Sequence, residues 1–171
     1  GTPFQDSNDF THHSTSYMMA NDLGGVNVNY GPGTAATIGN ATFCCTVDNL
    51  SKAPLADPTL TPYMSFGSWH SRLYGAEFDS GKLDKFDGAA GYIDAESAST
   101  DGELTNMGQK RKNIFAKFAA TVAPDTVLTF VAMYNQVHQN VGLGATAAQI
   151  AQYGPTWGLS SDPASQDYYG Y

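Results

Sequence analysis

Apolar and polar residues alternate with a period of two along much of the second half of the chain. In residues 109–122, the apolar positions from Ile114 to Val122 face one way, while Asn113, Lys117 and Thr121 face the other. Successive side chains of a β-strand point to opposite faces, so this alternation indicates a strand. Strand-length segments also cover residues 63–69, 72–83, 85–96, where the facing is ambiguous, and 126–136. We therefore predict an all-β fold containing an antiparallel meander of about five strands.

The connections between these segments alternate between short and long. Ala123-Pro124-Asp125 is a tight turn, 97–108 is a polar loop, and the tail 137–171 is the longest connection. Several segments approach the roughly 9 to 11 residues that a tilted strand needs to cross a bilayer. Membrane barrels combine short turns at one end with long loops at the other, so this pattern is typical of transmembrane strands.

An earlier stretch, residues 26–54, carries a separate β pattern. Val26, Val28 and Tyr30 alternate with two asparagines, which predicts a half-buried strand. The sequence Gly31-Pro32-Gly33 then predicts a turn, because proline fixes φ and glycine accepts positive φ. Gly39-Asn40 marks a second reversal before the strand-like run 41–50.

The remaining segments complete a four-part organisation. Residues 1–22 are polar and predict a loop, and 53–62 contain three prolines, which favour a linker over a central strand. In the tail, Thr146 can cap a short helix over 145–153, and Gly154-Pro155 would end it. The predicted parts are a β segment at 1–54, a linker at 55–62, strands at 63–136 and a long loop at 137–171.

Composition narrows the class of protein. Only 14% of the residues are charged, whereas Gly (18), Tyr (10) and Phe (9) are abundant, a mixture that favours strands and turns. The formal net charge of -8 argues against nucleic acid as a partner, since its phosphates are bound mainly by Lys and Arg. No apolar run is long enough for a membrane helix, and Gly1-Thr2-Pro3 is unlike the charged start of a signal peptide.

The sequence offers no constellation typical of an enzyme. The glycine-rich run at 31–39 lacks the Gly-Lys-Ser/Thr ending of a phosphate loop, and neither G-x-S-x-G nor H-E-x-x-H occurs. We therefore expect no catalytic residue, cofactor or metal centre. A disulfide between the adjacent Cys44 and Cys45 would be strained. They are interpreted as small packing residues, with a redox pair, intermolecular bridging and metal binding as alternatives.

Taken together, residues 26–54 resemble the end of the plug domain of TonB-dependent outer-membrane receptors. That family has a strand, a Gly-Pro turn, a small-residue stretch, a Gly-Gly strand and an exit ending in Ser-Lys-x-Pro. Cys44 and Cys45 stand where the family usually has two glycines, and Tyr30 where a basic residue is common. Residues 106–136 and the tail are similar to the second to fifth barrel strands and the third outer loop. The matching plug residues are Gly31, Pro32, Gly33, Thr34, Ala35, Gly39, Ala41, Phe43, Thr46, Val47, Ser51, Lys52 and Pro54.

This resemblance implies a fragment of a receptor in the bacterial outer membrane, where it would serve energy-coupled uptake of a scarce ligand such as a ferric siderophore. The implied partners are outer-membrane lipid, a TonB-type energy-coupling protein and the small-molecule ligand. Gly31, Pro32, Gly33, Gly39, Cys44 and Cys45 would form the turns and close packing of the plug segment. The implied ligand-facing residues, for which loop packing is the alternative role, are Phe10, His12, His13, Tyr17, Tyr153 and Trp157.

Two other functions fit the same sequence. About five strands form only part of a barrel, and the two unpaired edges of such a sheet could pair with copies of the chain in a self-associating β-rich assembly. Alternatively, the chain could be a secreted β-rich module that binds sugars or peptides through Trp69, Tyr74 and Trp157.

Overall fold

A computed structural model describes residues 19–33, 45–86, 88–140, 142, 144–165 and 168. The described structure is 57% strand, with one short helix and antiparallel sheets of two and five strands. The predicted all-β class is therefore confirmed.

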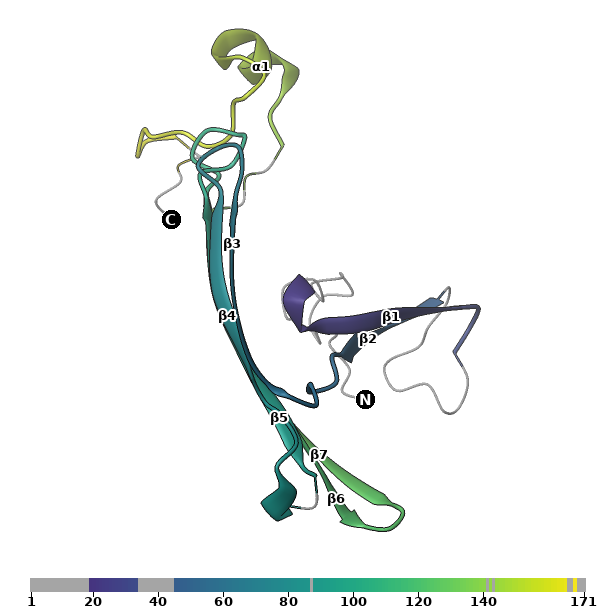
Figure 1. Cartoon of the computed structure of the whole chain (residues 1–171). Coiled ribbons are helices and arrows are strands. Elements are labelled where there is room, and N and C mark those ends of the chain that lie inside the picture. The colour runs from purple at the N-terminus through teal and green to yellow at the C-terminus, as the bar shows by residue number, and fades with distance from the viewer. Residues whose placement is uncertain are drawn as a thin grey trace. The chain divides into compact units, whose positions relative to one another are not determined.

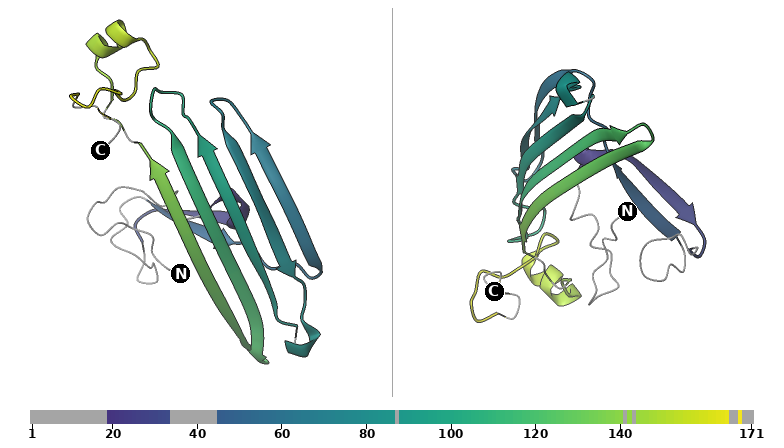
Figure 2. Two further views of the ribbon diagram at one scale, coloured as in Figure 1. Left: turned by 90° about the vertical axis from the view of Figure 1, so that its left-hand side faces the viewer. Right: turned by 90° about the horizontal axis from the view of Figure 1, so that it is seen from below.

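The smaller sheet is an antiparallel ribbon of β1 (Leu23–Tyr30) and β2 (Cys45–Ser51), preceded by the single 3-10 turn η2 (Ala20–Asp22). The larger sheet contains β3 (Pro58–Phe66), β4 (Arg72–Ser80), β5 (Ala90–Thr100), β6 (Gln109–Ala123) and β7 (Thr126–Gln139). Its strands lie side by side in chain order, as the predicted meander requires (Figures 1 and 2). A 3-10 turn, η3 (Asp84–Phe86), precedes β5, and α1 (Ala147–Tyr153) follows β7.

The predicted linker at 55–62 is wrong in its second half, because β3 begins at Pro58 and contains Pro62. Proline is excluded from a central strand, because there it removes a ladder hydrogen bond. β3 lies at the edge of its sheet, and an edge strand tolerates proline. The strand also ends at Phe66 instead of residue 69, since Gly67 N donates to Ser71 O at 2.9 Å and closes a turn.

β5 is also displaced from its predicted position at 85–96. Phe86 N donates to Leu83 O at 2.9 Å and Leu83 N donates to Ala89 O at 2.8 Å, so Leu83 is bridged to Ala89 before the strand begins. The strand starts at Ala90 and takes in the first part of the predicted polar loop, up to Thr100. The tight turn at 124–125 follows the prediction, whereas β4 ends at Ser80 instead of residue 83 and β7 continues to Gln139, three residues into the predicted long loop.

The chain divides into two compact units. The first contains Gly1–Pro58, Asp79–Tyr92 and Phe115–Val131, and the second contains Thr59–Phe78, Ile93–Ile114 and Ala132–Tyr171. Strands β4 to β7 contribute residues to both units.

The two faces of the five-stranded sheet are unlike. Contacts of Tyr63 with Asp94 and of Tyr92 with Phe115 define an inner face, on which Asp79, Tyr92, Asp94, Glu96, Asn113 and Phe115 are all buried. The outer face carries large apolar side chains that are 40% or more exposed: Leu60, Met64, Phe66, Tyr74, Phe78, Ile93, Ile114, Phe118, Val122, Leu128, Phe130 and Tyr134. The buried residues of the inner face are thus mostly polar, with Tyr92 and Phe115 as the exceptions, whereas the outer face is largely apolar. This arrangement resolves the facing of β5, whose Tyr92 lies inside and Ile93 outside.

In the ribbon, the predicted strand at 26–30 and the turn after it are both present. Gly31 has a φ of 110°, a value that glycine adopts readily. The expectation of a half-buried face is wrong, however, because Val26 and Val28 are 51% and 46% exposed. Alternation fixes which side chains share a face, but a buried face also needs a covering layer.

Candidate ligand-binding loops

The long loop after β7 carries a stacked aromatic pair. The rings of Tyr153 and Trp157 are 4.3 Å apart between centroids, with an interplanar angle of 23°. Tyr153 is the last residue of α1 and is 53% exposed. The structure therefore brings together these two sequence-predicted site residues and presents an aromatic surface at the end of the helix.

Local sequence explains why the helix forms where it does. Thr146 Oγ1 accepts from Gln149 N at 3.3 Å, and Gln149 Oε1 accepts from Thr146 N at 2.9 Å, which together make a capping box. Gly154, with a φ of 95°, ends the helix. Both the cap and the stop predicted from the sequence are confirmed.

This loop is tied to the β5–β6 connection by a short ladder of hydrogen bonds. Thr105 N donates to Thr156 O at 2.9 Å, and Leu159 N donates to Thr105 O at 2.8 Å. Asn106 extends the ladder, because its Nδ2 donates to Leu159 O at 2.9 Å and to Ser161 Oγ at 3.0 Å. The segment that carries Trp157 is thus held in place on both sides of that residue.

Asn106 has the conformation that this tether requires. Its φ is 59°, in the left-handed region that asparagine tolerates better than most residues. Its carbonyl oxygen accepts from Asn140 Nδ2 at 2.8 Å, which links the turn to the end of β7. Leu159 is 7% exposed, and a Cβ on Gly158 would collide with Thr105 O, so the two segments pack closely. Asn106 could not be identified from the sequence, since an asparagine in a polar loop carries no specific signal.

A second connection, between β3 and β4, is locked to the same region. Ser71 N donates to Ser68 O at 3.0 Å, and the central residues Trp69 and His70 both have a φ of 53°. Two consecutive positive φ values are a feature of type I′ hairpin turns, which usually use Asn-Gly or similar residues. Trp69 is 53% exposed, so this turn presents an indole ring to solvent.

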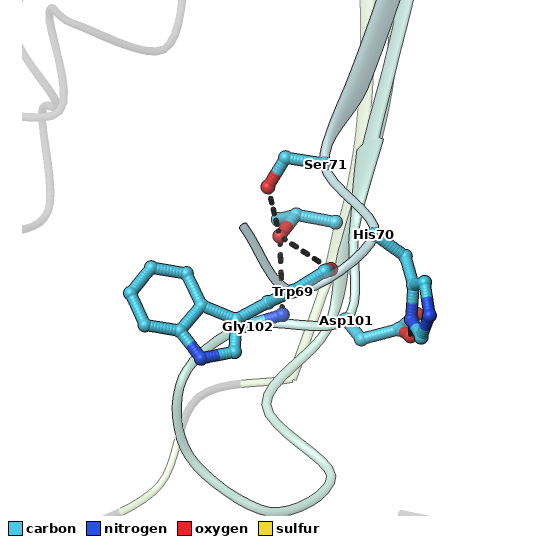
Figure 3. A network of polar contacts seen from close by, with 6 residues as sticks. Trp69, His70, Ser71, Asp101 and Gly102 are labelled. Atoms are coloured by element: carbon cyan, nitrogen blue, oxygen red, sulfur yellow. Dashed lines mark hydrogen bonds and ion pairs between the residues drawn. The ribbon is translucent and has the colours of Figure 1, made fainter. Parts of the chain in front are cut away.

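Thr100 accepts two of the hydrogen bonds that hold this turn, and Figure 3 shows the network with Trp69, His70 and Ser71 labelled. Its Oγ1 accepts from Ser71 Oγ at 2.8 Å and from Gly102 N at 3.1 Å, while Asp101 N donates to Trp69 O at 3.0 Å. His70 Nδ1 lies 2.7 Å from Asp101 Oδ2, with both side chains more than 70% exposed. In Figure 3 the Trp69 indole and the His70 imidazole point away from each other, so they do not form one binding surface.

The inner face of the second unit contains a phenol between two buried carboxylates. Tyr63 Oη lies 2.8 and 2.9 Å from the Asp94 carboxylate oxygens and 3.0 Å from Glu96 Oε2. Arg111 Nε donates to Asn135 Oδ1 at 3.3 Å on the same face. These groups make a polar lining instead of an apolar core. Among the described residues, no group of three or more His, Cys, Asp or Glu is placed to hold a metal ion.

The other sequence-predicted residues belong to the first 58 residues of the chain. Phe10, His12, His13, Tyr17, Gly39 and Cys44 lie outside the described residues. Gly31, Pro32 and Gly33 follow β1 directly, and a Cβ on Gly31 would meet open space. Cys45 is exposed and pairs with Tyr30 in the ribbon register.

Comparisons of the chain with family models, with curated proteins and with solved structures find no match. No helix within the described ranges is both long and apolar enough to span a membrane.

Proposed function

We propose that this chain is part of a TonB-dependent receptor of the bacterial outer membrane and serves energy-coupled uptake of a scarce ligand such as a ferric siderophore. The observation that carries the proposal is the reversed facing of the larger sheet. In β6, Asn113 is 1% exposed while its neighbour Ile114 is 45% exposed. A sheet in water places its apolar residues inward, whereas membrane strands place them outward.

The strand lengths support the same proposal. β5, β6 and β7 contain 11, 15 and 14 residues, which reaches or exceeds the roughly 9 to 11 that a tilted transmembrane strand needs. The outer faces of β6 and β7 carry no acidic or basic side chain from Ala116 to Val122 or from Thr126 to Gln136, whereas Lys110 and Lys112 lie on the outer face at the start of β6. Charged residues on a lipid-facing surface would be destabilising.

The ligand would contact the long loop. Tyr153 and Trp157 form a stacked, solvent-accessible pair, and the tether at Thr105 and Asn106 holds them on an ordered support. Aromatic rings provide a large contact area at a low cost in conformational entropy. Under this proposal, Trp157 and Tyr153 contribute to ligand affinity, whereas Trp69 lies on a different loop and does not contact the ligand.

A test of the membrane proposal compares two adjacent positions on β6. In a background with Cys44 and Cys45 replaced by Ser, single cysteines at Phe118 (outer face) and Ala119 (inner face) are labelled with an environment-sensitive fluorophore. After reconstitution into phospholipid vesicles, spin-labelled lipid should quench the label at position 118 several-fold more than the label at 119. Equal quenching at both positions, or failure of the folded chain to associate with vesicles, would rule the membrane proposal out.

A test of ligand binding uses the aromatic pair. Titration of the folded chain with ferric catecholate and ferric hydroxamate chelates should give saturable binding by calorimetry. Replacing Trp157 with Ala should weaken that binding about tenfold, in line with a buried aromatic anchor. Trp69→Ala is the matched control, because it removes the same side chain from a different loop. Equal affinity of the wild type and the Trp157 variant for the chelates would show that Trp157 does not contact the ligand.

One observation favours a second candidate function, a self-associating assembly. β7 is an edge strand of 14 residues that contains no Pro, Gly, Lys, Arg, Asp or Glu, so it lacks the features that usually prevent edge pairing. The opposite edge, β3, contains Pro58 and Pro62. Electron microscopy and light scattering of the chain without lipid would separate the two functions, since only this one predicts filaments or a defined oligomer there.

A further inference from the structure

Side chains of the larger sheet converge on a short stretch within the first unit, residues 51–56, which we name the exit segment. It connects the ribbon, which ends at Ser51, to β3, which begins at Pro58. Lys117, Asp79 and Tyr92, from three different strands of the sheet, contact it from the inner face. A connection between two sheets usually makes few such contacts, so this density is informative.

The ammonium group of Lys117 makes the most extensive of these contacts. Its Nζ lies 2.7 Å from Lys52 O, 3.0 Å from Ser51 Oγ and 3.3 Å from Ser51 O. An ammonium group has three protons to donate, so these three acceptors match its full capacity. Hydrogen bonds from a charged donor are stronger than those between neutral groups. Lys117 is therefore well placed to fix the end of the ribbon on β6.

Further contacts hold the exit segment along its length, at Lys52, Leu55 and Ala56. Lys52 Nζ lies 5.5 Å from the centre of the Tyr92 ring, within the range of a cation–π interaction, and Tyr92 stacks on Phe115. Further along, Leu55 N donates to Asp79 Oδ1 at 2.9 Å, and Lys82 N donates to Ala56 O at 2.9 Å. On the ribbon side, Lys52 N donates to Asp22 O at 3.1 Å.

We propose that Lys117 is a positioning residue that latches the exit segment to the sheet, so that the ribbon β1–β2 is held at its C-terminal end. The latch itself is a property of this chain, and its role in uptake rests on the proposed function. A force that acts on residues before the ribbon would then extend the chain upstream of Ser51. The exit segment and the sheet downstream of it would stay in place.

Hydrogen exchange measured by mass spectrometry tests the latch directly on the full folded chain, without ligand or energy-coupling protein. Lys117→Met keeps the length of the side chain but removes its charge and its donors. We expect the amides of Lys52 and Leu55 to exchange about tenfold faster in this variant, as loss of a charged hydrogen bond implies. Trypsin should also cleave the Lys52–Ala53 bond faster by a similar factor.

Two variants control this measurement. Lys112→Met removes a lysine from the exposed side of the same strand and should leave exchange in the exit segment unchanged. Lys117→Arg keeps a positive charge and N–H donors, so it should raise exchange less than Lys117→Met does, to no more than about threefold above the wild type. Wild-type exchange in Lys117→Met, or an equal increase in Lys112→Met, would overturn the latch.

If Lys117→Met does not fold, Ser51→Ala decides the question, because it removes one of the three acceptors and leaves both carbonyl groups. Exchange at Lys52 should then rise about two- to threefold, and an unchanged rate would contradict the proposal. Failure of the vesicle test at positions 118 and 119 would refute the receptor function without affecting this result. Normal exchange in the Lys117 variants would remove only the latch.

Discussion

The hydroxyl of Tyr63 lies 2.8 Å from Oδ1 of Asp94, and the carboxylate it contacts is completely buried. The two residues come from β3 and β5, on either side of β4. Gly75, on β4 between them, has no side chain. The Tyr63 ring occupies the space that a Cβ at Gly75 would fill. The phenol therefore reaches across one strand to hydrogen-bond a buried carboxyl group.

Replacing Tyr63 with Phe should destabilise the folded chain by about 1–3 kcal/mol, because the Asp94 and Glu96 carboxylates would lose a buried donor. The measurement is denaturant unfolding followed by near-ultraviolet circular dichroism. Tyr74→Phe is the control, since Tyr74 is 47% exposed on the outer face, and its loss of a hydroxyl should change the unfolding free energy far less. Equal effects of the two substitutions would contradict the role given to Tyr63.

Gly75→Ala should displace the Tyr63 ring and so disrupt the same contact with the carboxylates. We expect a destabilisation of about 1–3 kcal/mol, typical of overpacking a closely packed site. In a Tyr63→Ala background the added methyl group has space, so most of this effect should disappear. A double-mutant cycle of unfolding free energies measures the coupling, and additive effects would show that Gly75 is needed for another reason.

His70→Gly should leave the fold intact and stabilise it by up to about 1 kcal/mol. His70 occupies a positive φ of 53°, which is strained for histidine and unstrained for glycine. The contact with Asp101 that would be lost is highly exposed, and such pairs contribute little. Thermal unfolding checks the result, and a clear decrease in stability would mean that the His70–Asp101 pair matters more than its exposure indicates.

Asn106→Gly should loosen the long loop without destabilising the sheet. Glycine keeps the positive φ but lacks the Nδ2 group that donates to Leu159 O and Ser161 Oγ. Amides between residues 156 and 161 should therefore exchange several-fold faster, while those of β5 and β6 remain protected.

Thr146→Ala is the control for this loop, because it removes the cap of α1 and should affect exchange only in the helix. Unchanged exchange at Leu159 in the Asn106 variant would show that the backbone bonds of Thr105 hold the loop alone.

A structural feature of this chain could be predicted from the sequence only where the residues that determine it are close together in the chain. The helix α1 was predictable because its cap, its stop and its small size are all encoded within residues 146–154. The strand order was predictable because short and long connections favour neighbours in the chain. β3 was misplaced because the tolerance of an edge strand for Pro58 and Pro62 depends on its position in the sheet, which the local sequence does not contain.

The candidate site shows the same division. Tyr153 and Trp157 were named as ligand-facing residues of the long loop because of the family resemblance, and the structure places their rings in contact. Thr105, Asn106 and Thr100 were not selected, because each acts on a partner in a different loop. Asn106, for example, donates to Leu159 O, and the two residues are 53 positions apart in the chain.

Alternation alone determined that the second half of this chain forms strands and which residues share a face, since a strand has a fixed period of two. Only the tertiary structure decided which face is buried. It placed Asp94, Glu96 and Asn113 inside, next to partners such as Tyr63, and left Phe78, Ile114 and Phe130 outside. The reason is physical: burial of a carboxylate requires hydrogen-bond donors from other strands, and those donors meet it only when the sheet is assembled.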